Sequence, residues 1–202
     1  MIWFIADPHF GHANIIRYCH RPYSSVEEMN AALISNWNAL VKPTDTVYVV
    51  GDVAMGDAQA YLAKLNGRKI LIFGHHDRNP QLLCSHFEEI TPFKQVTIEG
   101  QDIVLCHYPL MDWPGREQGA WQLHGHKHGT YLPLEGKQWD VGVDVNNYRP
   151  VSFAQIKAIM SGRREAHGPA VGDPLEATRL MEKSQRGRMK ALGKIAAPRL
   201  SR

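Results

Sequence analysis

Five short apolar runs, each followed at once by aspartate or histidine, constrain the fold of this chain more than any other feature. Their lengths and their lack of helical spacing are typical of strands buried inside a sheet. The ends of such strands meet at one edge of a sheet, so we expect the polar residues that follow them to lie together. The runs are Ile2–Ala6, Val47–Val50, Ile70–Phe73, Ile103–Cys106 and the weaker Trp121–Leu123.

The residues that follow these runs are of two types, both of which bind divalent metals. The third run stops at Gly74, where the chain can turn sharply, and then presents three polar side chains, His75, His76 and Asp77. Imidazole and carboxylate groups suit manganese, iron, nickel and zinc. The pattern therefore predicts a metal site. The other four blocks are Asp7-Pro8-His9, Gly51-Asp52, His107 and Gly125-His126-Lys127-His128.

Taken in this order, the five blocks resemble the calcineurin-like metallophosphoesterase superfamily. The resemblance spans roughly residues 1–160, and segments 10–17 and 141–145 are similar to a group of compact bacterial and phage phosphoesterases. It implies a four-layer αββα sandwich, in which two mixed β-sheets are flanked by helices. Strand–helix alternation in the first half and hairpins in the second half fit this fold class.

The resemblance also implies two divalent transition-metal ions, with manganese foremost and iron, nickel or zinc as alternatives. Asp52 would bridge the two ions. The first ion would be bound by Asp7, His9, Asp52 and His128. The second would be bound by Asp52, His75, His107 and His126.

The activity implied by the resemblance is hydrolysis of phosphate esters by a metal-activated hydroxide. His76 would be the catalytic histidine that binds no metal, and Asp77 would orient its ring. A phosphodiester or nucleotide-type substrate is favoured, with a monoester as the alternative. Arg17 and His12 are weaker candidates for contact with the substrate. Arg17 has an equally good interpretation as a surface residue, whereas a structural or surface role is favoured for His12 and for His124, which also adjoins a ligand block.

His75 departs from the family pattern, which has asparagine at this position. It is either a natural variant, an engineered substitution or a site of altered metal affinity. A histidine must lose its proton before it binds a metal, so we expect the second ion to dissociate first as the pH falls. The same departure motivates an alternative function, a metal- or phosphate-binding module that has lost turnover.

Residues 162–202 differ in composition from the catalytic domain predicted for residues 1–161. They carry ten basic and four acidic residues, among several glycines and prolines. We interpret them as a flexible or loosely docked tail with a basic helix over 175–192. A nucleic-acid-binding arm is a further alternative for this segment. Three unpaired cysteines and the lack of a long apolar run predict a cytoplasmic protein without a membrane span. The oligomeric state stays open.

Spacing and turn residues also predict the elements between the ligand blocks. Helices are expected over 13–19, 25–41, 58–65 and 151–160, with a further helix beginning at Pro80. A hairpin is expected over 93–106, and a strand pair over 131–145.

Overall fold

The computed structural model describes residues 1–78, 83–131 and 136–163. They belong to one compact unit, Met1–Glu165. The expected tail from residue 164 onward and its helix over 175–192 lie outside the described residues, as does the start of the helix expected at Pro80. No helix among the described residues is long and apolar enough to cross a bilayer.

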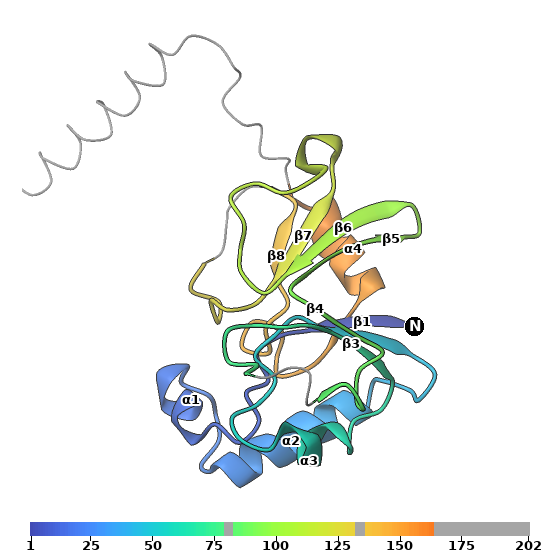
Figure 1. Ribbon diagram of the computed structural model, residues 1–202. Coiled ribbons are helices and arrows are strands. Elements are labelled where there is room, and N and C mark those ends of the chain that lie inside the picture. Colours follow the sequence, from blue (N-terminus) through green and yellow to red (C-terminus); the bar gives the residue numbers. More distant parts are fainter. Residues whose placement is uncertain (79–82, 132–135, 164–202) are drawn as a thin grey trace, which may run out of the picture. The chain divides into compact units, whose positions relative to one another are not determined.

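A five-stranded mixed sheet carries the first half of the ligand blocks (Figure 1). Its strands lie in the order β4-β3-β2-β1-β9. The first four strands are parallel, and β9 pairs antiparallel with β1. The bounds are β1 (Ile2–Ile5), β2 (Thr46–Val49), β3 (Arg68–Ile72), β4 (Glu89–Thr91) and β9 (Val151–Ser152).

A four-stranded mixed sheet carries the second half of the blocks. Its order is β5-β6-β7-β8, where β5 and β6 form the predicted hairpin and β6, β7 and β8 are parallel. The parallel pairing of β8 with β7 differs from the strand pair expected over 131–145, of which residues 132–135 lie outside the described ranges. The bounds are β5 (Phe93–Ile98), β6 (Gln101–Cys106), β7 (Trp121–His124) and β8 (Gln138–Asp140).

Serine side chains cap the starts of α2 and α4. The Ser25 hydroxyl accepts the N–H of Glu28 at the start of α2, and Ser152 forms a capping box with Gln155 at the start of α4. The expected helix over 151–160 is thereby corrected, because Val151 and Ser152 form the edge strand β9. The bounds are α1 (Ala13–Tyr18), α2 (Val26–Asn38), α3 (Ala58–Leu62), the 3₁₀ turn η2 (Arg116–Gln118) and α4 (Phe153–Ser161).

The five-stranded sheet is buried on both faces, as its apolar runs predict. In β1, Trp3 and Ile5 face one core, whereas Phe4 faces the other. The first core packs against α1, α2 and α3, which lie on the side of this sheet away from the four-stranded sheet (Figure 1). The second core lies between the two sheets and includes Phe153 and Ile156 of α4.

The outer face of the four-stranded sheet is covered differently from the expected sandwich. There Trp113, from the loop that contains η2, packs against Val104 and Ala120. The two mixed sheets of the predicted fold are therefore confirmed. In the described part of the chain, the outer layer over this sheet is a loop and not a regular helix.

Candidate metal centre

The ligand blocks meet because parallel strands end at a common edge. Asp7 follows β1, Asp52 follows β2 and His75 follows β3, and these three strands are parallel neighbours. In the other sheet, His107 follows β6 and His126 follows its parallel neighbour β7. The two sheet edges are joined at this point.

Two hydrogen-bonded contacts make that join. Ala6 pairs with Gly142 beyond the end of β8. The N–H of His126 donates to Asp7 Oδ2 over 2.9 Å. The ends of strands from two different sheets are thus bound to each other, so all five ligand blocks converge as the sequence predicts.

Most of the predicted ligands have a strained backbone. Positive φ angles between 48° and 69° occur at five of the seven, and non-glycine residues adopt this region uncommonly. Such strain persists only where the surrounding structure enforces it, and it is concentrated at functional sites. The five are Asp7, His9, Asp52, His126 and His128.

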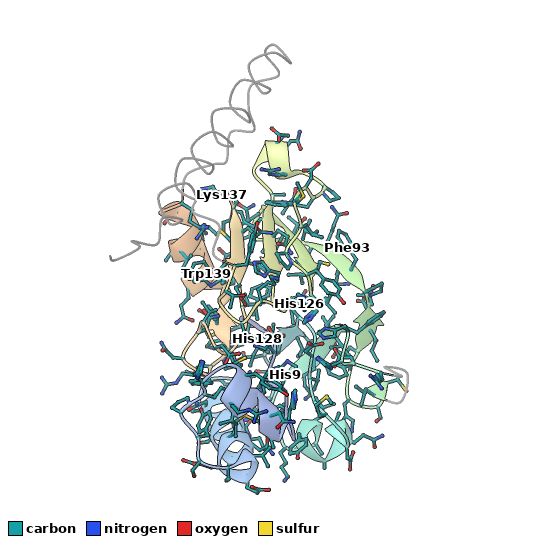
Figure 2. All side chains as sticks on the ribbon, turned by 90° about the vertical axis from the view of Figure 1, so that its left-hand side faces the viewer. His9, Phe93, His126, His128, Lys137 and Trp139 are labelled. Atoms are coloured by element: carbon teal, nitrogen blue, oxygen red, sulfur yellow. The ribbon has the colours of Figure 1, made fainter. Side chains whose placement is uncertain are left out.

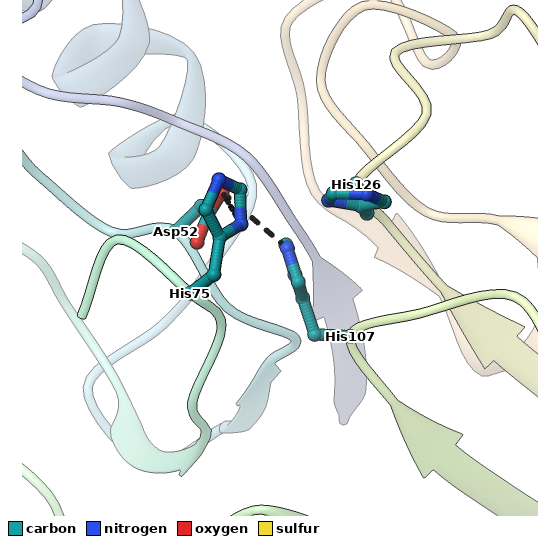
Figure 3. A group of neighbouring side chains, drawn as sticks. All are labelled: Asp52, His75, His107 and His126. Atoms are coloured by element: carbon teal, nitrogen blue, oxygen red, sulfur yellow. Dashed lines mark ion pairs between the residues drawn. The ribbon is translucent and has the colours of Figure 1, made fainter.

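The predicted ligands form two adjacent groups that could each hold a metal ion. In each group the candidate ligand atoms lie within 4.8 Å of one another. Figure 2 labels His9, His126 and His128 near one another, below the four-stranded sheet in that view. Four side chains of the second group approach one another from separate loops (Figure 3). The first cluster is Asp7, His9 and His128, and the second cluster is Asp52, His75, His107 and His126.

Asp52 stands between the two clusters. Its Oδ2 atom lies 3.6 Å from His9 Nε2 in the first cluster. The same oxygen lies 3.3 Å from His75 Nδ1 and 3.3 Å from His107 Nε2 in the second. One carboxylate oxygen therefore faces imidazole nitrogens of both clusters, which is the arrangement that a bridging ligand requires.

In both Asp7 and Asp52, one carboxylate oxygen accepts a hydrogen bond and the other has no hydrogen-bond partner. Asp7 Oδ2 accepts the N–H of His126, and Asp52 Oδ1 accepts the N–H of His76. The atoms Asp7 Oδ1 and Asp52 Oδ2 are buried without a hydrogen-bond partner, as are His9 Nε2 and His107 Nε2. Buried polar atoms of this kind are costly unless something binds them. These atoms fit a cation.

In two of the candidate histidine ligands, the Nδ1 atom has a hydrogen-bonding partner, which leaves Nε2 to face the site. His107 Nδ1 lies 2.9 Å from the carbonyl of Val50, and His128 Nδ1 lies 2.7 Å from Asp144 Oδ2. A partner at Nδ1 selects the tautomer and directs Nε2 toward a metal, as in most histidine-ligated sites.

Burial and neighbouring charges shift the pKa values of the candidate ligands, and within each cluster some are raised and others lowered. Burial raises the pKa of Asp7 to about 7 and lowers that of His9 to about 2. Burial lowers the pKa of His126 to about 4 and also lowers that of His75. Burial likewise opposes the charge on His128, but its hydrogen bond to Asp144 raises that pKa to about 10.

Asp52 and His107 share a charge interaction. Burial would raise the pKa of Asp52, yet the adjacent His107 lowers it well below the usual range. Burial would lower the pKa of His107, and the Asp52 carboxylate raises it. Asp52 is therefore ionised throughout the physiological range, as a bridging ligand must be.

His76 lies beside the clusters without belonging to either of them among the described residues. Its ring centroid is 3.8 Å from that of His75 and 5.3 Å from that of His9. It adjoins a pocket of about 420 Å³ that is also lined by Met55, Asp57 and Arg78.

Asp77 differs from its expected role. Its two oxygens accept the N–H groups of Asp52, Val53 and Gly74, each over 2.8 Å. The hydrogen bonds of Asp77 thus go to backbone, and the carboxylate fixes the two loops that present Asp52 and His76. None of the described hydrogen bonds of Asp77 goes to the His76 ring, which the sequence predicted this carboxylate to orient.

The weaker candidates for substrate contact lie in different places in the structure. His12 Nδ1 lies 3.4 Å from His9 Nδ1, and its ring is 6.1 Å from that of His76, so His12 borders the site. Arg17 is exposed on α1, with its guanidinium 5.4 Å from the Tyr18 ring, and no described contact joins it to a ligand. His124 is buried, with Nδ1 2.9 Å from the carbonyl of Gly125.

Sequence reasoning missed Arg21 and Asp144, which support the first cluster. Arg21 is buried and pairs with Asp144, which in turn contacts His128. Asp144 lies in the segment that resembles phage phosphoesterases, yet nothing in its spacing indicated a partner for His128. Cys19 also lies near His128 and Asp144. Asp144 is already bound by Arg21, so we infer that Asp144 orients the His128 ring and is not itself a metal ligand.

Comparisons with known proteins show which proteins this chain is similar to. No protein-family model matches the chain. The chain is 39% identical to the uncharacterized protein MJ1445 of Methanocaldococcus jannaschii, over 80% of this chain and 93% of that protein. The chain belongs to the MJ1445 family. It is also 26% identical to the Gene 66 protein of Mycobacterium phage L5, over 82% of this chain and 97% of the phage protein.

Solved structures resemble the chain as well. The protein of unknown function AQ665 from Aquifex aeolicus is 28% identical and covers 79% of this chain and 98% of its own, with a TM-score of 0.65. An archaeal phosphodiesterase is a more distant neighbour, at 17% identity and a TM-score of 0.45 over 70% of this chain and 81% of its own.

Proposed function

We propose that this chain is a metal-dependent phosphoesterase that uses a pair of divalent cations. The observation that carries the proposal is the position of Asp52 Oδ2, a buried oxygen without a hydrogen bond that faces both clusters. Asp7, His9 and His128 would hold one ion, and His75, His107 and His126 the other, with Asp52 between them. When bound, the ions would supply positive charge for the phosphate oxygens and lower the pKa of a water molecule.

His76 would act as the proton donor in this proposal. It lies beside both clusters, and its backbone N–H binds Asp52 Oδ1, which fixes its position relative to the bridge. Proton transfer to a leaving oxygen requires such a positioned group outside the ligand set. The pocket of about 420 Å³ next to His76 would receive the leaving group, with Arg78 in its wall.

An open site supports a phosphodiester or nucleotide-type substrate over a monoester. The His75 side chain is 43% exposed, and Tyr108, whose ring is 4.8 Å from that of His126, is also exposed. No further subdomain covers this edge in the described ranges. A substrate with groups on both sides of the phosphate would therefore fit, and manganese is the cation we propose first.

Hydrolysis of aryl phosphate esters tests this proposal. The metal-stripped chain should be inactive, and added Mn²⁺ should restore hydrolysis of bis(p-nitrophenyl) phosphate above that of p-nitrophenyl phosphate. Asp52→Asn is the matched variant, because it keeps the shape of the side chain and removes the bridging charge. A chain that binds two ions and hydrolyses neither ester would instead be a binding module.

The catalytic domain in this proposal is residues 1–161. The two clusters draw their ligands from residues 7–128. A chain that ends after Gly162 should therefore bind the same number of ions and hydrolyse a small ester at the same rate. A large loss of turnover in a folded truncation would extend the catalytic unit into residues 162–202.

A further inference from the structure

Arg21 is a buried cation placed directly behind the first cluster. Its side chain is fully buried. Nε and one terminal nitrogen donate to the two oxygens of Asp144, each over 2.8 Å. The terminal nitrogens also donate to the carbonyls of Asp7 over 2.8 Å and Pro8 over 2.9 Å. Arginine suits such a place, because its planar fork can satisfy a carboxylate and carbonyls together.

These bonds reach every member of the first cluster. The carbonyls of Asp7 and Pro8 belong to the loop that holds Asp7 and His9 at positive φ. Asp144, the partner of Arg21, contacts the Nδ1 atom of His128. One guanidinium thus supports the backbone that presents two ligands and the ring orientation of the third.

Arg21 is turned away from the open side of the site. One of its terminal nitrogens lies 3.4 Å from the sulfur of Met29, a fully buried residue of α2. A cation that points into the core cannot contact a phosphate ester. Its charge would also repel a metal ion unless Asp144 balanced it, and the two-point pair with Asp144 does so.

The second cluster is supported by a different residue. Asp77 accepts the backbone N–H groups of Asp52 and Gly74, which fixes the loops that carry Asp52 and His75. None of the described hydrogen bonds of Arg21 goes to the second cluster. The two clusters therefore have different supporting residues, Arg21 and Asp77, although they share Asp52 and although the N–H of His126 in the second cluster donates to Asp7 of the first.

We propose that Arg21 is a positioning residue for the first metal site, acting through Asp144 and the Asp7–Pro8 carbonyls, and that the second site does not depend on it. The inference rests on the metal-binding part of the proposed function. It does not require that the substrate be a phosphate ester.

Calorimetric titration of Mn²⁺ into the metal-stripped full chain tests the proposal. Arg21→Lys keeps the charge but loses the planar fork, and Asp144→Asn keeps the shape but loses the charge. Each should weaken one binding event roughly 10–100-fold, the usual effect of removing a group that orients a metal ligand. The other event should keep its affinity. His128→Ala and His107→Ala identify the two events, because each removes a ligand from one cluster.

The double variant Arg21→Lys/Asp144→Asn adds a second readout. Residues that act as a unit are non-additive, so it should weaken the same event no more than the stronger single variant does. Electron paramagnetic resonance gives a third. One equivalent of Mn²⁺ in these variants should occupy the second site alone, and two equivalents should yield less of the spin-coupled pair than in the wild type.

Lys69→Met is the matched control. Lys69 is another buried cation, which donates to the carbonyls of Leu65 and Gly67 away from both clusters. Its loss should lower thermal stability and leave both binding events unchanged.

Several results would overturn the proposal. If Arg21→Lys and Asp144→Asn weaken both events equally, or neither, Arg21 does not position the first site. If Arg21→Lys fails to fold, Asp144→Asn decides alone. A wild-type chain that binds no Mn²⁺ would overturn the proposed function as well, whereas one that binds two ions without hydrolysing esters would refute only the activity.

Discussion

Acidification should release the ion of the first cluster before that of the second. Two ligands of the first cluster carry protons near neutral pH, because the pKa of His128 is about 10 and that of Asp7 is about 7. A metal must displace these protons. From the sequence, His75 suggested the opposite order, but burial lowers its pKa and moves proton competition there to more acidic pH.

The size of the change in metal affinity with pH follows from the number of protons that each ion displaces. Between pH 8 and pH 6, His128 lowers the apparent affinity of the first ion about 100-fold and Asp7 lowers it about tenfold, a total of roughly 1000-fold. In the second cluster, His126, whose pKa is about 4, is already neutral over this range, and the lowered pKa of His75 weakens proton competition there. His107, whose pKa is raised, competes most strongly, and one such group changes the apparent affinity by at most about 100-fold.

Titration of Mn²⁺ at pH 6, 7 and 8, in buffers of different ionisation enthalpy, measures both affinities and the protons released. At pH 7 the first ion should release more protons than the second. His75→Asn should leave the pH dependence of the second ion unchanged. Equal pH dependence of the two ions, or a steeper dependence for the second, would refute the reasoning.

Four further changes have defined outcomes. Asp52→Asn should bind fewer than two ions by metal analysis and lose measurable hydrolysis, because one charge serves both clusters. His76→Ala should keep both ions but lose roughly 10²–10⁴ in rate, and less with a nitrophenolate leaving group; equal losses would exclude proton donation. Gly74→Ala should lose metal, since its Cβ would collide with Asp52 Oδ1 and the His107 ring. Ile156→Ala, in the core between the sheets, should lose about 2–5 kcal/mol in urea unfolding with unchanged metal binding.

Much of the fold could be predicted from the sequence because its signals are local. Apolar runs without helical spacing located β1, β2, β3 and β6, and Ser25 marked the start of α2. Pairing partners were harder to predict. Whether β8 pairs in a hairpin or beside β7 depends on contacts between segments far apart in the chain, and so does the loop that covers the outer face of the four-stranded sheet.

The glycine before His75 illustrates the same limit. The sequence suggested that Gly74 permits a sharp turn. In the structure it is needed for space, because any side chain there would meet Asp52 and His107 from two other loops. A requirement that arises from three separate segments leaves no mark in the local pattern beyond the glycine itself.

The sequence by itself determined which residues meet at the candidate metal centre, since parallel strands deliver whatever follows them to a common edge. Only the tertiary structure decided how those residues are grouped and which hydrogen bonds each of them makes. It placed the candidate ligands in two clusters, directed Asp77 to backbone N–H groups, and placed the Arg21–Asp144 pair behind His128. The shifted pKa values of Asp7 and His128 also favour an order of acid sensitivity opposite to the one expected from the sequence. Distances between loops and the burial of charges determine these properties, and both exist only after the chain has folded.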